Sequence, residues 1–340
     1  MSLGWDDHFA AAFEPFVFTH TVARVARVDR GMVDCLTAAG AIRVRIRFGA
    51  EPPVTGDWVA VVEDDAGWWL DGTLPRRTAI TRAAASGRSD AQVLAANVDV
   101  VFVAVPAFPE PRPGVVERLL TLAWTSGATP VVVVTKCDLS HGAAALVAEV
   151  AENAPGVEVV GVSSLTGEGI DELRSYVADG RTACLLGPSG VGKSTLVNAL
   201  VGAEVLETDR VRRDGKGRHT TTRRELIALP SGGALLDTTG LRGAGLWSDE
   251  EAIERTFADV EELAAQCRFG DCAHVTEPDC AVLAAIDTGQ LPGRRLEAWR
   301  KLRREAQWMA ARADARLLAE RRRAWKVLSV ETRRAGRSRP

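Results

Sequence analysis

A glycine-rich stretch in the middle of the chain has the residue types and spacing of a phosphate-binding loop. Residues 187–194 read GPSGVGKS, the pattern GxxxxGK[ST], between an apolar run at 183–186 and a helical pattern from residue 195. In this context backbone N–H groups can surround a phosphate at a helix N-terminus, with Lys193 on the β- and γ-phosphates and Ser194 on Mg²⁺. A chance glycine-rich turn is the alternative, which the flanking patterns disfavour. The predicted nucleotide-binding residues here are Gly187, Pro188, Ser189, Gly190, Val191, Gly192, Lys193, Ser194 and Thr195.

Two loops that precede this stretch have the pattern of guanine recognition. Residues 135–138 read TKCD, of the form [NT]KxD, in which the Asp138 carboxylate accepts from guanine N1–H and the amino group. Adenine lacks that donor pair, so the carboxylate would stay unpaired with the wrong base. The stem of Lys136 can cover the face of the base. Ser163 and Ser164 match a loop that contacts guanine O6 through backbone N–H, and Thr135 completes the predicted set.

Two loops that follow it are predicted to contact the γ-phosphate and Mg²⁺. Residues 217–222 read GRHTTT, where a threonine, taken here as Thr221, can complete the Mg²⁺ shell and order its loop in the triphosphate state. Residues 237–240 read DTTG, of the form DxxG. Asp237 is expected to hold Mg²⁺ through water, together with Ser194, and the Gly240 N–H to bond the γ-phosphate.

A cluster of soft ligands lies further along the chain. Cys267, Cys272, His274 and Cys280 fall within a short segment that holds three of the six cysteines. Such a set suits a tetrahedral Cys₃His zinc site, and because the protein fills every position the zinc should be structural, one ion per chain. Accidental reduced cysteines are the alternative.

The net charge of −3 hides a basic C-terminal region on an otherwise acidic chain. Such a region is a candidate contact for a polyanion, and a solvated helix face is the alternative. An aromatic ring within it can stack on a nucleic-acid base or simply pack. The residues predicted for this contact are Arg321, Arg322, Arg323 and Trp325.

The elements that carry these residues follow from hydrophobic periodicity. Five short strands between residues 19 and 75 predict a small barrel, most simply an OB-fold, and residues 76–96 look like a connector that ends in a helical turn. On the third strand Arg43, Arg45 and Arg47 alternate with aliphatic residues, so they form an outward row that could follow a phosphate backbone or be an ordinary solvated face.

From residue 98 the chain alternates long strands and helices up to the phosphate-binding loop. Near-continuous valine runs such as 131–134 are typical of strands buried on both faces, which predicts a doubly wound α/β domain. The first twenty residues have no basic region before an apolar core, and no apolar run approaches the ~20 residues of a membrane span. We therefore expect a cytoplasmic protein that does not enter a membrane.

The order of these motifs resembles that of the circularly permuted GTPases, because the base-reading loops precede the phosphate-binding loop. With the barrel before and the Cys/His cluster after, the chain looks like the ribosome small-subunit-dependent GTPase family of bacterial 30S maturation. The resemblance implies three parts: an N-terminal OB-fold, a central permuted GTPase domain and a C-terminal helical zinc module. The boundaries expected are 1–18 for an N-terminal extension, 19–80, 81–247 and 248–330 for these parts, and 331–340 for a basic tail.

The resemblance also implies the activity and the partners. The protein is expected to be a monomer that binds GTP or GDP with Mg²⁺ and hydrolyses GTP when it docks on the small subunit and its rRNA. Residue 241, after DxxG, is Leu rather than a water-orienting Gln. The resemblance implies that His219 replaces that glutamine as the catalytic residue. The family's base-reading loop usually begins with Asn, and Thr135 here weakens the bond toward guanine N7. Two other hypotheses remain open, an RNA-binding assembly factor that uses nucleotide only as a ligand and an ATP-dependent small-molecule kinase.

Overall fold

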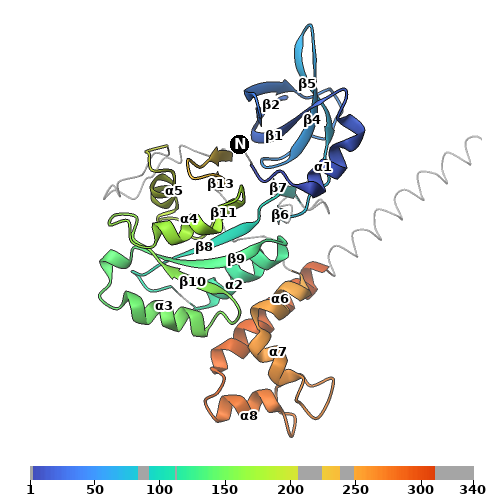
Figure 1. Ribbon diagram of the computed structural model, residues 1–340. Helices are drawn as coiled ribbons and strands as arrows, with labels where there is room; N and C mark the ends of the chain where they lie inside the picture. Colours follow the sequence, from blue (N-terminus) through green and yellow to red (C-terminus); the bar gives the residue numbers. More distant parts are fainter. Residues whose placement is uncertain (1–2, 83–91, 112, 206–223, 238–248, 311–340) are drawn as a thin grey trace, which may run out of the picture.

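The structure is a computed structural model that describes residues 3–82, 92–111, 113–205, 224–237 and 249–310. An N-terminal barrel, a central α/β unit and a C-terminal set of helices follow one another along the chain (Figure 1). Of the helices described, none has the length and apolar character needed to cross a membrane.

The N-terminal unit is a closed five-stranded barrel, as the alternating pattern predicts. Its strands pair in the order β1-β2-β3-β5-β4, and β4 pairs with β1. The junction between β3 and β5 is parallel and the other pairings are antiparallel. Alternate aliphatic residues such as Val25, Val33, Val44 and Val59 fill the interior. The strands are β1 (Thr21–Asp29), β2 (Met32–Thr37), β3 (Gly40–Arg45), β4 (Trp58–Asp64) and β5 (Gly67–Thr73).

The residues that precede the barrel pack against it. Helix α1 (Asp7–Phe13) begins after Asp6, whose carboxylate accepts from the N–H groups of His8 and Phe9, and the 3₁₀ turn η1 (Glu14–Phe16) follows. Phe9 and Phe13 are buried, and Trp5 meets Trp58 of β4 edge to face. Aromatic burial therefore fixes this helix on the barrel.

A hairpin joins the barrel to the central sheet. Strands β6 (Ala79–Arg82) and β7 (Gln92–Ala96) pair antiparallel, so the expected helical turn at the end of this connector is wrong. Alanine favours helices, but pairing with β6 buries Leu94, Ala95 and Ala96 in the core. Tertiary burial overrides the local preference.

The central unit is a six-stranded sheet in the order β10-β9-β8-β11-β13-β12, parallel except for β12. Val101 and Val103 of β8 belong to one core and Phe102 to another, so helices cover both faces, as predicted for a doubly wound domain (Figure 1). The strands are β8 (Val100–Pro106), β9 (Thr129–Thr135), β10 (Glu158–Gly161), β11 (Thr182–Leu186), β12 (Glu225–Ala228) and β13 (Ala234–Asp237). The helices are α2 (Pro113–Thr125), η2 (Cys137–Leu139), α3 (Ala143–Glu152), α4 (Ile170–Tyr176) and α5 (Lys193–Val201).

The strand order explains where a ligand can bind. The chain runs outward from β8 through β9 to β10, then returns to place β11 on the other side of β8. Such a reversal opens a crevice at the carboxyl ends of the strands. The loops after β9, β10, β11 and β13, which carry the predicted nucleotide residues, all leave from this edge.

The C-terminal helices form a separate small core next to the sheet. The elements are α6 (Glu250–Thr256), α7 (Ala258–Ala264), α8 (Ala281–Asp287) and a helix over residues 293–310. Phe257, Val260, Val282 and Trp299 are buried in this core. The helical zinc module predicted from the sequence thus has the expected fold.

Candidate nucleotide site and metal centre

The phosphate-binding loop joins β11 to α5 at the carboxyl edge of the sheet. Gly190 (φ +78°) and Gly192 (φ +101°) adopt backbone conformations that side chains disfavour, and Gly192 caps α5. The loop thereby turns its N–H groups and the start of the helix toward one point, which suits a phosphate. Lys193 Nζ donates to the carbonyl oxygens of Gly187 (2.9 Å) and Pro188 (2.8 Å), so the ammonium group already lies over the loop.

The base-reading loop after β9 is bonded to the phosphate-binding loop. Thr135 Oγ1 lies 2.7 Å from the Val191 carbonyl oxygen, and Lys136 Nζ donates to the Gly190 carbonyl oxygen at 2.7 Å. Lys136 has a left-handed backbone (φ +60°), which directs the chain into the turn η2. The two loops are therefore held as a single surface.

The loop after β10 orients Asp138. Ser163 Oγ donates to Asp138 Oδ1 at 2.7 Å and accepts from the N–H groups of Leu165 (3.3 Å) and Thr166 (3.1 Å). Ser163 is buried and Asp138 is exposed, so a fixed hydroxyl holds an accessible carboxylate. This pairing across 25 residues of chain joins the two predicted guanine loops. Ser164 lies beside it and is half-buried.

The described part of the predicted Mg²⁺ site consists of Ser194 and Asp237. Ser194 is the second residue of α5, and Asp237 is buried at the end of β13, the neighbour of β11. A hydroxyl and a carboxylate are the hard oxygen donors that Mg²⁺ prefers. Thr221, Gly240 and His219 lie outside the described residues.

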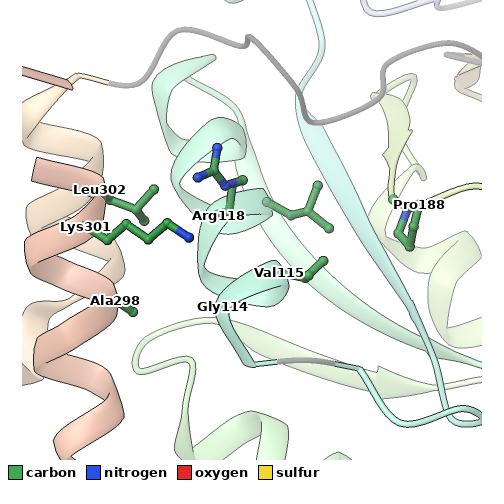
Figure 2. A pocket seen from close by; sticks show the side chains of 9 residues that line it. Gly114, Val115, Arg118, Pro188, Ala298, Lys301 and Leu302 are labelled. Carbon is green, nitrogen blue, oxygen red and sulfur yellow. The ribbon is translucent and has the colours of Figure 1, made fainter. Parts of the chain in front are cut away.

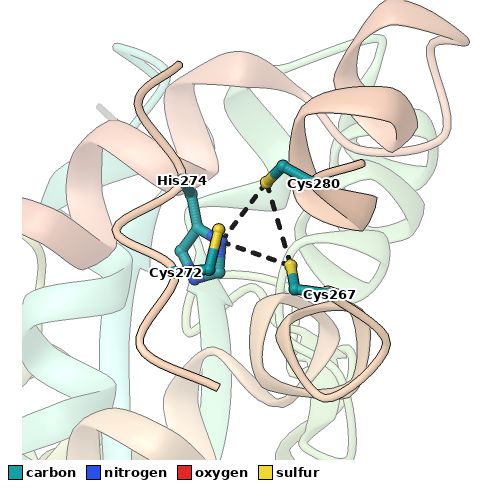
Figure 3. Close-up of side chains that lie close together, drawn as sticks. All are labelled: Cys267, Cys272, His274 and Cys280. Atoms are coloured by element: carbon teal, nitrogen blue, oxygen red, sulfur yellow. Dashed lines mark hydrogen bonds between the residues drawn. The ribbon is translucent and has the colours of Figure 1, made fainter. Parts of the chain in front are cut away.

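The four predicted zinc ligands converge. Their ligand atoms all lie within 4.8 Å of one another (Figure 3). Cys267 Sγ is 3.8 Å from Cys280 Sγ, and His274 Nδ1 is 3.6 Å from Cys267 Sγ and 3.4 Å from Cys280 Sγ. Tetrahedral zinc with ordinary bond lengths needs separations of about 3.8 Å between sulfurs and about 3.5 Å between sulfur and nitrogen. The geometry therefore fits a Cys₃His zinc ion, with no protein position left for a catalytic water.

The ionisation of two ligands also suits a metal. Burial raises the pKa of Cys267, but hydrogen bonds from the backbone N–H groups of Val282 and Ala281, together with those from the Cys280 and Cys272 thiols, leave this pKa below its ordinary value. Burial lowers the pKa of His274, which keeps its ring neutral. A thiolate and a neutral imidazole are the forms that coordinate zinc.

Neighbours that the sequence did not reveal support the ligands. Glu277 accepts from the N–H groups of Ala273, Val275 and Thr276, which shapes the backbone on both sides of His274. Arg300 donates to the His274 carbonyl, and the Trp299 ring lies 5.6 Å from the imidazole. A charged residue three positions after a ligand is a weak signal, so sequence reasoning did not select Glu277.

Comparison with known proteins shows which family has this combination of nucleotide-binding loops and Cys/His cluster. Residues 73–247 match the family description "RsgA GTPase", just over half of the chain. The small ribosomal subunit biogenesis GTPase RsgA of Streptomyces avermitilis is 52% identical over 98% of this chain and 92% of its own length. The protein of the same name from Opitutus terrae is 43% identical over 96% and 95%. The chain belongs to the RsgA GTPase family.

Solved structures agree with this placement. The crystal structure of YjeQ from Thermotoga maritima matches with a TM-score of 0.65 and 28% identity, over 85% of this chain and 99% of that one. YloQ, described as a circularly permuted GTPase, matches with a TM-score of 0.62 over 85% and 96%, and at 23% identity it supports the fold. The predicted permuted GTPase fold is confirmed, and GTP hydrolysis follows from membership of the RsgA GTPase family.

The three arginines predicted to form a row on the barrel of this RsgA-family chain have different neighbours. Arg43 lies 3.7 Å from carboxylate oxygens of both Asp29 and Asp34. The guanidinium groups of Arg45 and Arg47 lie 5.4 and 5.9 Å from the centre of the Trp69 ring. Strand β3 ends at Arg45, so the expected row of three arginines on one strand is wrong for Arg47, which lies beyond it. Trp69 of β5 is a candidate stacking residue that sequence reasoning missed, since Arg45 and Arg47 come from elsewhere in the chain. Arg321, Arg322, Arg323 and Trp325 lie outside the described residues.

A cavity of about 390 Å³ lies between the phosphate-binding loop and the C-terminal helices of this RsgA-family chain (Figure 2). Lys301 and Leu302 of the helix over residues 293–310 face Val115 and Arg118 of α2 across it. Its lining is Gly114, Val115, Arg118, Leu119, Gly187, Pro188, Ala298, Lys301 and Leu302.

Proposed function

We propose that this GTPase acts on the small ribosomal subunit during its late maturation in the cytoplasm, as a monomer, and that the subunit stimulates hydrolysis. The relatives named small ribosomal subunit biogenesis GTPase RsgA, which align with nearly the whole chain, carry the proposal. The barrel arginines beside the half-buried Trp69 favour an RNA partner. We also propose that the functional units are residues 1–18, 19–80, 81–247, 248–330 and 331–340.

Base recognition is assigned to the loops after β9 and β10. Asp138 accepts from guanine N1–H and the amino group, and the loop of Ser163 and Ser164 donates backbone N–H to O6. Ser163 supports this role because its hydroxyl holds the carboxylate. Thr135 and Lys136 position the loop on its neighbour.

The phosphates are assigned to residues 187–195. Lys193 exchanges its carbonyl partners for the β- and γ-phosphate oxygens, and the Gly240 N–H donates to the γ-phosphate. Ser194, Thr221 and Asp237 would hold Mg²⁺, which neutralises phosphate charge when bound. Zinc at Cys267, Cys272, His274 and Cys280 has a structural role.

Hydrolysis requires water to attack the γ-phosphorus while the bond to the β,γ-bridging oxygen breaks, leaving GDP and inorganic phosphate. Residue 241 is Leu, so no glutamine follows DxxG to orient the water. We assign this orientation to His219, brought to the γ-phosphate when the subunit is bound. The RNA contacts are assigned to Arg43, Arg45, Arg47, Arg321, Arg322, Arg323 and Trp325.

Turnover of GTP and ATP with and without purified small subunits tests the proposal. The chain alone should hydrolyse GTP slowly, and small subunits should raise kcat by about a hundredfold or more, the size of positioning and general-base effects. Large subunits and unrelated naked RNA are the matched controls. Equal stimulation by either would contradict the small-subunit assignment, and absence of stimulation would favour an RNA-binding assembly factor for another ribosomal particle.

The His219→Ala variant tests the catalytic assignment. It should lose most of the stimulated turnover while it keeps GTP affinity and subunit binding, whereas Lys193→Ala should lose GTP affinity as well. Full stimulated turnover in His219→Ala would remove His219 from the mechanism and leave the partner assignment intact.

A further inference from the structure

Thr135 occupies the position from which an asparagine, usual in this family, would reach guanine N7. Guanine presents two acceptors along this edge, O6 and N7. The O6 contact is assigned above to backbone N–H groups, so N7 depends on a side-chain donor. What Thr135 does with its hydroxyl therefore decides whether N7 is read.

The Thr135 hydroxyl is committed to the protein. Its oxygen lies 2.7 Å from the Val191 carbonyl oxygen and 3.2 Å from the Val105 carbonyl oxygen. A threonine hydroxyl has one proton to donate, and both neighbours are acceptors. Thr135 is only 3% exposed, so its side chain lies beneath the ligand-facing surface. Donation to N7 would leave a buried carbonyl contact unmade, which is costly.

The next donor along the loop is also engaged with the phosphate-binding loop. Lys136 Nζ donates to the Gly190 carbonyl oxygen, adjacent in sequence to the Val191 carbonyl that Thr135 contacts. Residues 135 and 136 thus share one task, which is to hold the base-reading loop on the phosphate-binding loop. An asparagine amide has two N–H donors and could serve Val191 and N7 together, whereas threonine serves one.

We propose that Thr135 is a positioning residue and that this GTPase does not read guanine N7. It selects guanine through Asp138 and the O6 contact, and it accepts guanine nucleotides altered at position 7. This inference rests on the proposed base-reading role of the loop and extends it to a class of ligand, the 7-deazaguanine nucleotides.

Calorimetric titration of the full chain with GDP, 7-deaza-GDP and ADP tests the proposal. Wild-type protein should bind 7-deaza-GDP within about twofold of GDP. Thr135→Asn should bind GDP more tightly than 7-deaza-GDP by about five- to tenfold, the value of one added hydrogen bond. Thr135→Val, which keeps the shape and removes the hydroxyl, should bind both nucleotides more weakly and by the same factor.

The controls distinguish failure of this proposal from failure of the base-reading assignment on which it rests. Thermal unfolding of each variant shows whether it has kept its fold, so weaker binding by a folded Thr135→Val protein reports the loss of the hydroxyl. Wild-type discrimination of tenfold or more against 7-deaza-GDP would overturn the proposal, as would an unchanged ratio in a Thr135→Asn protein that binds GDP. Equal binding of GDP and ADP would instead overturn the base-reading assignment itself.

Discussion

Ser163 sets the direction of the Asp138 carboxylate, and this single contact joins the two loops that we propose read the base. The carboxylate keeps a negative charge at an exposed position where the donors of guanine can reach it. Its recognition depends on being an acceptor at both oxygens, so replacing one oxygen with an amide changes which base fits.

Asp138→Asn should therefore change nucleotide preference. The amide nitrogen opposes the 2-amino group of guanine and can donate to the 2-oxo group of xanthine. The affinity for GTP should therefore fall, and the ratio of XTP affinity to GTP affinity should rise by about a hundredfold. Competitive binding of GTP, XTP and ATP measures this. Asp171→Asn, an exposed aspartate of α4 that pairs with Arg174, is the control and should leave the preference unchanged. Unaltered preference in Asp138→Asn would remove the residue from base recognition.

At the scale of elements, the segment between α7 and α8 has little apolar core of its own, so we expect a metal to hold it. Metal analysis should find about one zinc per chain. Cys272→Ser should lower that ratio and increase hydrogen exchange in residues 267–280, because three ligands hold zinc less well than four. The barrel is the internal control, and its strands, such as β2 with Leu36, should exchange as before. Normal stability in protein free of metal would contradict the zinc assignment.

Glu277 is expected to preorganise the same element. Its pKa is lowered to about 2 by hydrogen bonds from backbone N–H groups, first its own and then those of Val275, Ala273 and Thr276. A depressed carboxylate pKa stabilises the fold above pH ~4.5, and that contribution is lost as the pH falls toward 2. Glu277→Ala should release zinc to a chelator faster at neutral pH, and Glu262→Ala, an exposed glutamate of α7, should not. Equal release from both variants would show that the loop does not need Glu277.

At the scale of the whole molecule, Arg295 joins the C-terminal helices to the sheet. Its fully buried guanidinium bonds Asp259 through two nitrogens, Glu117 of α2 and the carbonyl oxygens of Asn153 and Thr256. Burial raises the pKa of Glu117, and the charge of Arg295 opposes that rise. The charge network therefore ties the zinc module to the half of the GTPase unit that precedes the phosphate-binding loop.

Arg295→Ala should destabilise this junction strongly. Removal of Arg295 leaves the buried Glu117 carboxylate and the half-buried Asp259 carboxylate without this partner, which costs about 3–5 kcal/mol. Thermal unfolding followed by calorimetry should show a lower Tm for the C-terminal helices. Arg255→Ala removes an exposed pair with Glu251 and should cost about 1 kcal/mol or less. A Tm for Arg295→Ala as high as that of the control would mean that the network does not hold the module.

The sequence could predict those parts of the fold that depend on local spacing. The phosphate-binding loop, the barrel strands and the zinc ligands are each specified by residues close together in the chain. Contacts between distant segments were not visible. Arg295 looks like any other arginine of a basic region, and the pairing of Arg43 with Asp29 and Asp34 depends on barrel register. The helical turn expected at the end of residues 76–96 is strand β7, because an alanine-rich composition carries no information about pairing with β6.

The barrel also covers one edge of the central sheet. Strand β12 is the last strand on its side, and β1 of the barrel lies beside it. An uncovered edge strand can pair with the edge of another molecule and start aggregation. A chain shortened to begin after the barrel would keep every nucleotide loop, yet it would expose β12. We therefore expect the barrel also to limit self-association by covering β12. Poor solubility of such a shortened chain would then report an exposed edge strand rather than a misfolded nucleotide site.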